Sequence, residues 1–307
     1  MSARDLKTEI KKNSSFPLTH SQELWADEVS EFVTEKKEDN ILILRGYAGT
    51  GKSSMIALLV RSLPVVRQRA VLLAPTGRAA KVISAYSQKK AFTIHKKIYF
   101  SNAEGGQVRF RLKNNTHRNT LFIVDESSMI GEDNSGGRLF DRGSLLHDLV
   151  QYVEGGDNCK LIFVGDTAQL PPVHLLLSPA LDPEKLEYEF NKTVPVRELE
   201  EVVRQQLDSG ILWNATRLRE LIASEDATQF VFQLEGFPDV VRLQDGNEFM
   251  ELLSGALQKN GEDSTVLIVR SNKRANQYNQ SIRQRILFLE SDLSIGDSLM
   301  LVKNNYQ

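Results

Sequence analysis

The sequence predicts an α/β fold built on a parallel β-sheet. Short runs of consecutive apolar residues recur between residues 41 and 164, and such runs are typical of strands buried on both faces of a sheet. Segments with helical spacing separate them, and strand and helix in alternation indicate a parallel sheet with crossover helices. With 307 residues, 41% of them hydrophobic and 25% charged, the chain has the composition of a globular protein of two domains.

The expected elements follow one another from the N-terminus. Residues 1–17 are polar, and we expect them to be flexible. A helix follows, for which Thr19 or Ser21 can serve as N-cap. The expected strands are Ile41–Leu44, Ala70–Leu73, Leu121–Val124 and Leu161–Val164, and the helices between them are Ser53–Leu63, Arg78–Ser87 and Ser144–Tyr152.

Two segments depart from this alternation of strands and helices. Two β-prone runs flank Glu104-Gly105-Gly106, which predicts a β-hairpin inserted at about residues 98–116. After about Val173 the chain becomes irregular and acidic, and a second α/β segment then begins. Its expected elements are a helix at Ile211–Ile222, a strand at Thr265–Val269 and a helix at Lys273–Arg285. We therefore expect one domain over residues 18–204 and another over 205–307.

Composition and targeting signals exclude several classes of protein. The net charge is −2 and there is one cysteine, Cys159, so no intramolecular disulfide forms, and no His/Cys cluster has the spacing of a zinc site. The N-terminus lacks the apolar region of a secretory signal, and no stretch approaches the length of a membrane helix. We expect a cytoplasmic protein without a membrane partner.

A glycine-rich phosphate-binding pattern lies directly after the first expected strand. Gly46–Ser53 satisfies G-x-x-x-x-G-K-[ST] between a strand and a helix, which is the context that this pattern requires. Glycines let successive backbone N–H groups turn toward one anion, and the helix N-terminus adds partial positive charge. The alternative is a strand-to-helix turn with an incidental lysine. The nucleotide-binding residues expected here are Gly46, Ala48, Gly49, Thr50, Gly51, Lys52, Ser53 and Ser54.

Acidic and amide side chains follow two later strands. Leu121–Val124 ends in Asp125-Glu126, which places both carboxylates at the carboxyl edge of the sheet beside the phosphate pattern. Asp125 is expected to hold Mg²⁺ together with Ser53, and Glu126 to act as the general base for water. After Val164, Asp166 and Gln169 reach the same edge, where Gln169 can report a γ-phosphate. A solvated acidic loop and an ordinary turn stopped by prolines are the respective alternatives.

Taken together, these segments resemble the superfamily 1 helicases, specifically the RecD-like, 5′-to-3′ branch (superfamily 1B). Gly46–Ser53 resembles motif I, Ala74–Ala80 motif Ia, Val124–Met129 motif II and Val164–Val173 motif III, in the order and spacing of that family. Arg270–Asn279 resembles motif IV. The resemblance implies a P-loop NTPase domain of the RecA-like type with a small hairpin insertion, followed by part of a second RecA-like domain.

The resemblance also implies roles that the residues alone do not show. Leu18–Gln22 resembles the Q motif, in which Gln22 would read the adenine edge and favour ATP over GTP. Glu201–Gln205 resembles the segment that carries an arginine finger, so Arg204 would meet the γ-phosphate. Without the resemblance, each is more simply a solvent-facing helix residue. The expected catalytic residues are then Lys52, Glu126, Gln169 and Arg204, with ATP and Mg²⁺ as cofactors.

Single-stranded DNA is the partner that the resemblance implies, bound by a monomer in repair or recombination. A basic run from Arg67 to Lys97 contains no Asp or Glu, which suits phosphate contacts, although it also suits a solvated face. Phe110 is an alternative to Phe100 at the duplex junction. RNA is not excluded. The expected DNA contacts are Pro75, Thr76, Gly77, Arg78, His95 and Phe100.

The chain departs from the family at its C-terminal end, where motifs V and VI do not appear. We therefore expect a truncated form that binds ATP–Mg²⁺ weakly and unwinds no duplex. Three other functions fit parts of the sequence. They are a P-loop ATPase switch or remodeller acting on protein, a nucleic-acid-binding module without unwinding activity, and a small-molecule kinase.

Overall fold

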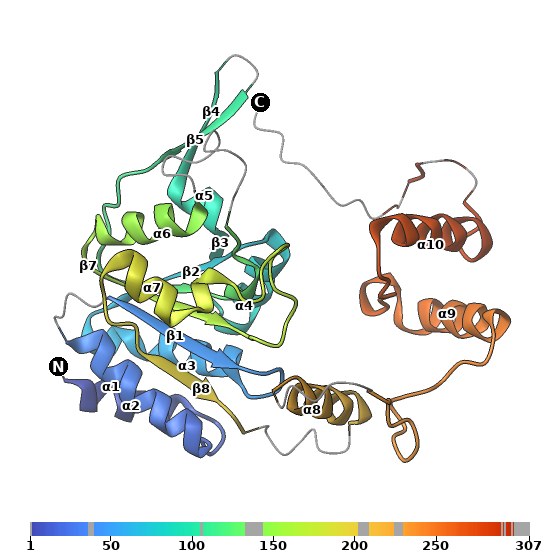
Figure 1. The fold of residues 1–307 in the computed structure, drawn as a ribbon, viewed down its shortest axis with the longest axis horizontal. Helices are drawn as coiled ribbons and strands as arrows, with labels where there is room; N and C mark the ends of the chain where they lie inside the picture. The colour runs from blue at the N-terminus through green and yellow to red at the C-terminus, as the bar shows by residue number, and fades with distance from the viewer. Residues whose placement is uncertain are drawn as a thin grey trace. The chain divides into compact units, whose positions relative to one another are not determined.

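The computed structural model describes residues 2–35, 40–104, 107–132, 144–201, 209–223 and 230–289, with 291, 293–295 and 297. Its centre is a six-stranded sheet in the order β3-β2-β6-β7-β1-β8 (Figure 1). All neighbouring strands in it are parallel, as the sequence predicts. The strands are β1 (Ile41–Gly46), β2 (Arg69–Ala74), β3 (Ala91–Thr93), β6 (Arg118–Val124), β7 (Asp157–Gly165) and β8 (Val196–Leu199).

Helices cover both faces of this sheet. Successive residues of a strand point to opposite faces, so Leu42 and Leu44 join one apolar core while Ile41 and Ile43 join the other. The first core contains side chains of α1 (Ala3–Asn13), α2 (His20–Thr34), α3 (Lys52–Ser62) and α4 (Gly77–Ser87). The second contains side chains of α5 (Ile94–Ile98), α6 (Leu145–Glu154) and α7 (Pro183–Phe190). The fold is therefore a three-layer α/β/α sandwich.

The N-terminal segment differs from the flexible tail that its polarity suggests. Residues Ala3–Asn13 form α1, and its apolar side chains Leu6 and Ile10 are fully buried. These two residues are four apart, which places them on one face of a helix. Two apolar residues in a polar segment are a weak sequence signal, yet they suffice because α2 and α3 offer a surface to cover.

The predicted hairpin is present as an antiparallel pair. Strand β4 (Tyr99–Glu104) pairs with β5 (Gln107–Leu112), with Tyr99 opposite Leu112. Its base is anchored in the core, because Tyr99 is buried and its hydroxyl donates to Asp148 Oδ2 of α6 at 2.6 Å. The hairpin therefore projects from a fixed base.

By their internal contacts the residues divide into two compact units, one covering 1–208 and 219–224 and the other 209–218 and 225–305. The described α-helices after residue 208 are α8 (Gly210–Ala223), α9 (Gly246–Asn260) and α10 (Asn272–Arg285). The strand expected at Thr265–Val269 does not form. Val266 and Ile268 are 67% and 89% exposed, and the described part of the second unit offers no strand with which this segment could pair.

Across the described ranges, none of the helices combines the length and the apolar character needed to cross a membrane. The single cysteine, Cys159, is buried in β7.

Candidate functional site

Three strand ends bring the predicted site residues to one edge of the sheet. Strand β7 pairs with β1 on one side, with Arg45 opposite Gly165, and with β6 on the other, with Val124 opposite Phe163. The segments that begin at Gly46, Asp125 and Asp166 therefore leave the sheet side by side. Because the carboxyl edge of a parallel sheet is where α/β proteins bind their ligands, this edge is the candidate site.

The segment Gly46–Ser53, which we call the phosphate loop, folds around its own backbone. Gly49 and Gly51 have φ of 83° and 88°, in the left-handed region that glycine adopts without strain. Thr50 is buried, and its hydroxyl donates to the carbonyl of Tyr47 at 2.8 Å. Helix α3 begins at Lys52, directly after the loop. The loop therefore has the strand–turn–helix form in which backbone N–H groups gather around an anion.

The ammonium group of Lys52 lies inside this loop. It donates to the carbonyl oxygens of Gly46 and Tyr47 at 2.5 and 3.0 Å. Burial lowers the pKa of Lys52, and the charges of Asp166, Asp125 and Glu126 oppose that effect. The amine is thus surrounded by acceptors and acidic groups that keep a cation in place at the edge of the sheet.

The backbone conformation of the loop leads to a stability prediction. A Cβ on Gly51 would lie 2.8 Å from Gln22 Nε2 at a φ of +88°, so Gly51→Ala is expected to destabilise the fold by about 1–3 kcal/mol. Gly77→Ala is the matched control, because a Cβ on Gly77 would meet nothing within 4 Å. Thermal unfolding of both variants tests this, and equal stability of the two would contradict it.

The two predicted carboxylates stand in different surroundings. Asp125 is 9% exposed, and burial followed by the charge of Glu126 raises its pKa to about 6, against the lowering effects of the Glu126 N–H and of Lys52. Glu126 is partly exposed and has a φ of 54°, a left-handed conformation uncommon for a residue with a side chain. The two side chains therefore leave the strand end differently, as two separate roles require.

A divalent cation fits this donor set. Asp125 is a nearly buried carboxylate beside a second acid, and a bound cation would offset that like-charge burial. Ser53, the second residue of α3, is partly buried at the start of the same helix as Lys52. Carboxylate and hydroxyl oxygens are ligands that Mg²⁺ accepts, usually together with substrate phosphates. Asp125 and Ser53 are the residues that would hold the ion, and their assignment as metal ligands stays a prediction.

A short turn after Asp125 connects the second and third motifs. The 3₁₀ helix Ser127–Met129 is fixed by Ser178, whose Oγ lies 2.7 Å from the carbonyl oxygens of both Ser127 and Ile130. Ser128 then donates from its hydroxyl to Gln169 Oε1 at 2.9 Å. This bond occupies the amide oxygen of Gln169 and leaves its NH₂ group as the end available to a phosphate oxygen.

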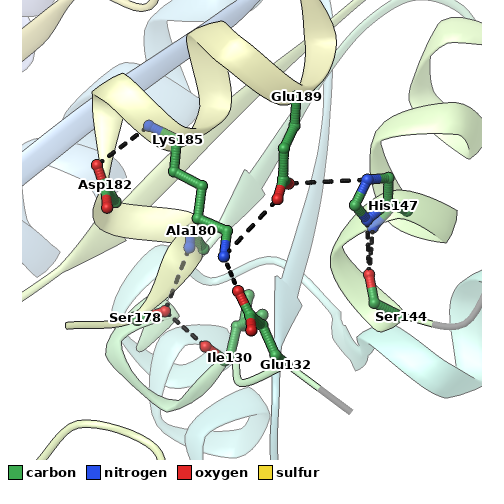
Figure 2. Close-up of polar contacts among 9 residues, drawn as sticks. All are labelled: Ile130, Glu132, Ser144, His147, Ser178, Ala180, Asp182, Lys185 and Glu189. Carbon is green, nitrogen blue, oxygen red and sulfur yellow. Dashed lines mark hydrogen bonds and ion pairs between the residues drawn. The ribbon is translucent and has the colours of Figure 1, made fainter. Parts of the chain in front are cut away.

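Helix α7 holds this turn through charged side chains (Figure 2). Lys185 forms ion pairs with Glu132, after the turn, and with Glu189 on its own helix. Glu189 also lies 3.7 Å from His147 of α6, whose Nδ1 is 2.8 Å from the Ser144 hydroxyl. The network ties α7 to α6 and to the segment after Asp125, although the sequence gives no sign of it beyond a charged stretch.

The predicted adenine reader, Gln22, is buried against the phosphate loop. Its Nε2 donates to the Thr50 carbonyl at 3.0 Å, and its Oε1 accepts from the Thr19 N–H at 3.1 Å. Thr19 is the N-cap of α2, which settles the choice that the sequence left between Thr19 and Ser21. Gln22 thus contacts the phosphate loop directly, a contact that the motif pattern did not predict.

The predicted DNA contacts lie after β2, on α5 and at the base of the hairpin. Pro75–Arg78 follow β2, where Thr76 caps α4 by accepting from the Ala79 N–H at 3.2 Å. Gly77 and Arg78 are exposed. His95 lies on α5, with its ring centroid 5.9 Å from that of Tyr99. Phe100 is 53% exposed at the base of the hairpin, while the side chain of Phe110 is outside the described part of the chain.

A cluster of lysines and phenylalanines adjoins these residues. Lys90 and Lys97 lie over the ring of Phe92, with Nζ 5.4 and 5.6 Å from its centroid, and Lys113 lies 5.3 Å from the centroid of Phe100. Burial lowers the pKa of Lys97, and the charge of Lys113 lowers it further. We call these five residues the basic–aromatic face. Neighbouring cations of this kind suit a polyanion that would relieve their repulsion.

The structure does not describe one predicted site residue, and it adds two contacts at the phosphate loop that the motifs did not predict. Arg204 lies outside the described residues. Arg219, which groups with the first unit, has its guanidinium 4.4 Å from the ring centroid of Tyr47 in the phosphate loop, and no motif indicated it. Asp166 is buried and its charge acts on Lys52. In the sequence, the Gly165-Asp166 pair at the end of a strand was the only indication that Asp166 would act on Lys52.

The parallel sheet, the phosphate loop at the end of β1 and the carboxylates at the end of β6 define a P-loop NTPase fold. The family model described as an AAA domain matches residues 28–175. The chain is similar in sequence to DNA helicases, which agrees with the resemblance that the motifs indicated. Membership of the 5′-to-3′ branch stays a prediction.

Individual relatives show the extent of the similarity. The chain is 28% identical over 152 residues to the ATP-dependent RecD2 DNA helicase of Deinococcus radiodurans, covering 48% of this chain and 18% of that protein. It is 25% identical over 289 residues to the ATP-dependent DNA helicase dda of Enterobacteria phage T4, covering 92% and 61%. The crystal structure of Pif1 helicase from Candida albicans aligns at a TM-score of 0.41 and 18% identity, covering 86% and 61%. The chain thus spans less than two thirds of each relative.

Proposed function

We propose that this protein hydrolyses ATP with Mg²⁺ and couples hydrolysis to movement along single-stranded DNA in the 5′-to-3′ direction. The observation that carries the proposal is the meeting of Lys52, Asp125 with Glu126, and Gln169 at adjacent strand ends. The matched DNA helicases support DNA as the partner. The direction of movement rests on the resemblance of the motifs to the 5′-to-3′ branch.

The residues of the site divide the chemistry among them. Backbone N–H groups of the phosphate loop bind the phosphates, and Lys52 exchanges its loop carbonyl partners for phosphate oxygens. Glu126 orients and deprotonates the attacking water, and Gln169 donates to a γ-phosphate oxygen from its NH₂ group. Mg²⁺, when bound by Asp125 and Ser53, neutralises phosphate charge. Arg204 is proposed to stabilise the negative charge of the transition state.

The basic–aromatic face favours DNA over a protein target. Its lysines can contact phosphates, and the exposed ring of Phe100 can stack on a base without regard to sequence, as a motor that moves along DNA requires. Gly77 and Arg78 add an exposed turn and an arginine after β2, the strand that pairs with β3. A remodeller of protein has no need of this combination.

The test of the function is ATP hydrolysis measured with and without single-stranded DNA. The proposal expects turnover that rises when DNA is added. Displacement of a protein block from the 5′ or the 3′ end of single-stranded DNA reports the direction of movement without requiring duplex unwinding. Turnover that is unaffected by DNA but stimulated by a protein would favour the remodeller. Binding of DNA without any turnover would favour a nucleic-acid-binding module.

The basic–aromatic face gives a prediction about salt dependence. Lys90→Glu with Lys97→Glu is expected to weaken single-stranded DNA binding about equally for all sequences, because phosphates carry no sequence information. Each lost phosphate contact should make the slope of log affinity against log salt less negative by about 0.7. Lys12→Glu, on the exposed surface of α1, is the control and should leave the slope unchanged.

A further inference from the structure

A hydrogen-bond network connects the end of β8 to the start of α2. Glu201 lies two residues beyond β8, and its carboxylate accepts from the Thr19 hydroxyl at 3.0 Å and from the Ser21 N–H at 3.1 Å. The Ser21 hydroxyl also donates to it, and the neighbouring Glu200 N–H donates to that hydroxyl at 3.3 Å. A carboxylate thus sits at the positive N-terminal end of α2, the favourable position for an anion.

The same helix end continues to the phosphate loop. Thr19 donates its N–H to Gln22, and Gln22 donates to the Thr50 carbonyl inside the loop. Gln22 is 1% exposed and Thr50 fully buried, so water does not compete for the bond between them. Glu201 is therefore joined to the phosphate loop by the sequence of contacts Glu201, Thr19, Gln22, Thr50.

Glu201 carries its negative charge in this arrangement. Burial alone would raise the pKa of Glu201, but the hydrogen bonds from Ser21 and Thr19 outweigh burial and hold the pKa below its ordinary value. Hydrogen bonds to an ionised acceptor are stronger and shorter than neutral ones. The charged form is thus the one that holds the start of α2.

We propose that Glu201 is a positioning residue for nucleotide binding, which holds Gln22 against the phosphate loop by fixing Thr19 and Ser21 at the start of α2. The proposal rests on the proposed function as an ATPase and adds a residue to its binding machinery. Glu201 touches no reacting atom, so it acts on affinity for ATP rather than on the chemical step.

The chain offers a control on the same two elements. Arg197 of β8 donates from Nε to Glu28 Oε2 of α2 at 2.7 Å. This ion pair also joins α2 to β8, but it lies farther along the helix, past Gln22. Removing the Arg197–Glu28 pair therefore shows the effect of loosening α2 from β8 in general. Removing the Glu201 carboxylate shows the effect of loosening the start of α2, where Gln22 lies.

The test is a double-mutant cycle on the affinity for ATP–Mg²⁺, measured by calorimetric titration of the whole chain. Glu201→Ala and Gln22→Ala are each expected to raise the Kd about fivefold, and the double variant to raise it no further than about twofold beyond the larger single effect. Glu28→Ala is expected to stay within about twofold of the wild type. KM should rise while kcat is retained.

The results of this cycle separate a failure of the role of Glu201 from a failure of the proposed function. The role of Glu201 would be overturned if the increases in Kd of the two single variants multiplied in the double variant. It would also be overturned if Glu28→Ala raised the Kd as much as Glu201→Ala does. Wild-type protein that binds no ATP would instead overturn the proposed function, so the two failures are distinguishable. If Glu201→Ala does not fold by circular dichroism, Glu201→Gln replaces it. Glutamine keeps one acceptor oxygen but lacks the charge. Glu201→Gln should therefore lower the affinity for ATP less than Glu201→Ala, and its effect should be coupled to that of Gln22→Ala in the same way.

Discussion

Replacing Lys52 with alanine is expected to lower ATP turnover by at least about 10³-fold, the scale on which preorganised charges at a phosphoryl group contribute to catalysis. The ammonium group is held among the loop carbonyls of Gly46 and Tyr47 and the charges of Asp125, Glu126 and Asp166. Among residues 46–53, Lys52 is the one basic side chain. Steady-state hydrolysis with saturating ATP measures the loss.

Binding of single-stranded DNA is expected to be retained when Lys52 is replaced. Because the basic–aromatic face does not include Lys52, Lys52→Ala should bind single-stranded DNA within about twofold of the wild type. Lys12→Ala, a lysine on the exposed side of α1, is the control for removing one positive charge and should retain both activities. Turnover that survives in Lys52→Ala would show that the phosphate loop is not the site of hydrolysis.

Replacing Asp125 with asparagine is expected to abolish Mg²⁺-dependent turnover and, in the protein without nucleotide, to stabilise the fold at neutral pH. The pKa of Asp125 is raised from 3.8 to about 6, chiefly by burial and then by Glu126. The folded protein therefore prefers the neutral carboxyl. That preference contributes stability fully below pH 3.8, and the contribution is lost as pH rises through about 6.

Above pH 6 the charged carboxylate destabilises the fold by up to about 3 kcal/mol, since each pKa unit corresponds to about 1.4 kcal/mol. Asn lacks the charge, so Asp125→Asn should gain most of this at pH 8 and little at pH 4. Denaturant unfolding at both pH values measures it. Asp157→Asn, an exposed acid, should change stability little at either pH. A variant less stable than wild type at pH 8 would refute the account.

The sequence was sufficient to predict the strands that carry the site. Ile41–Leu44, Leu121–Val124 and Leu161–Val164 are continuous apolar runs, and each became a strand buried on both faces. The motifs after them are local patterns with fixed spacing, so their placement at the sheet edge followed from the strands. Strand β8 escaped prediction because Val196–Leu199 contains two charged residues, which a strand at the edge of the sheet tolerates.

Contacts between distant segments could not be predicted from local patterns. The bond between Ser128 and Gln169 spans 41 positions and those of Glu201 to Ser21 span 180, and no periodicity relates such residues. Helix α1 shows the same limit, because burial of Leu6 and Ile10 depends on the neighbouring helices. The strand expected at Thr265–Val269 failed for a related reason, since an apolar run forms a strand only beside a partner.

The central position of β7 determines which parts of the site can move. This strand is bonded on both sides, to the strand of the phosphate loop and to that of Asp125, so a shift among the three would break whole ladders of hydrogen bonds. Gln169, by contrast, is exposed and is held by one side-chain bond to Ser128. Under the proposed function, the sheet therefore serves as a rigid frame during ATP hydrolysis. Structural changes that follow hydrolysis are then transmitted through the loop that follows β7 and through the helix ends that contact the phosphate loop.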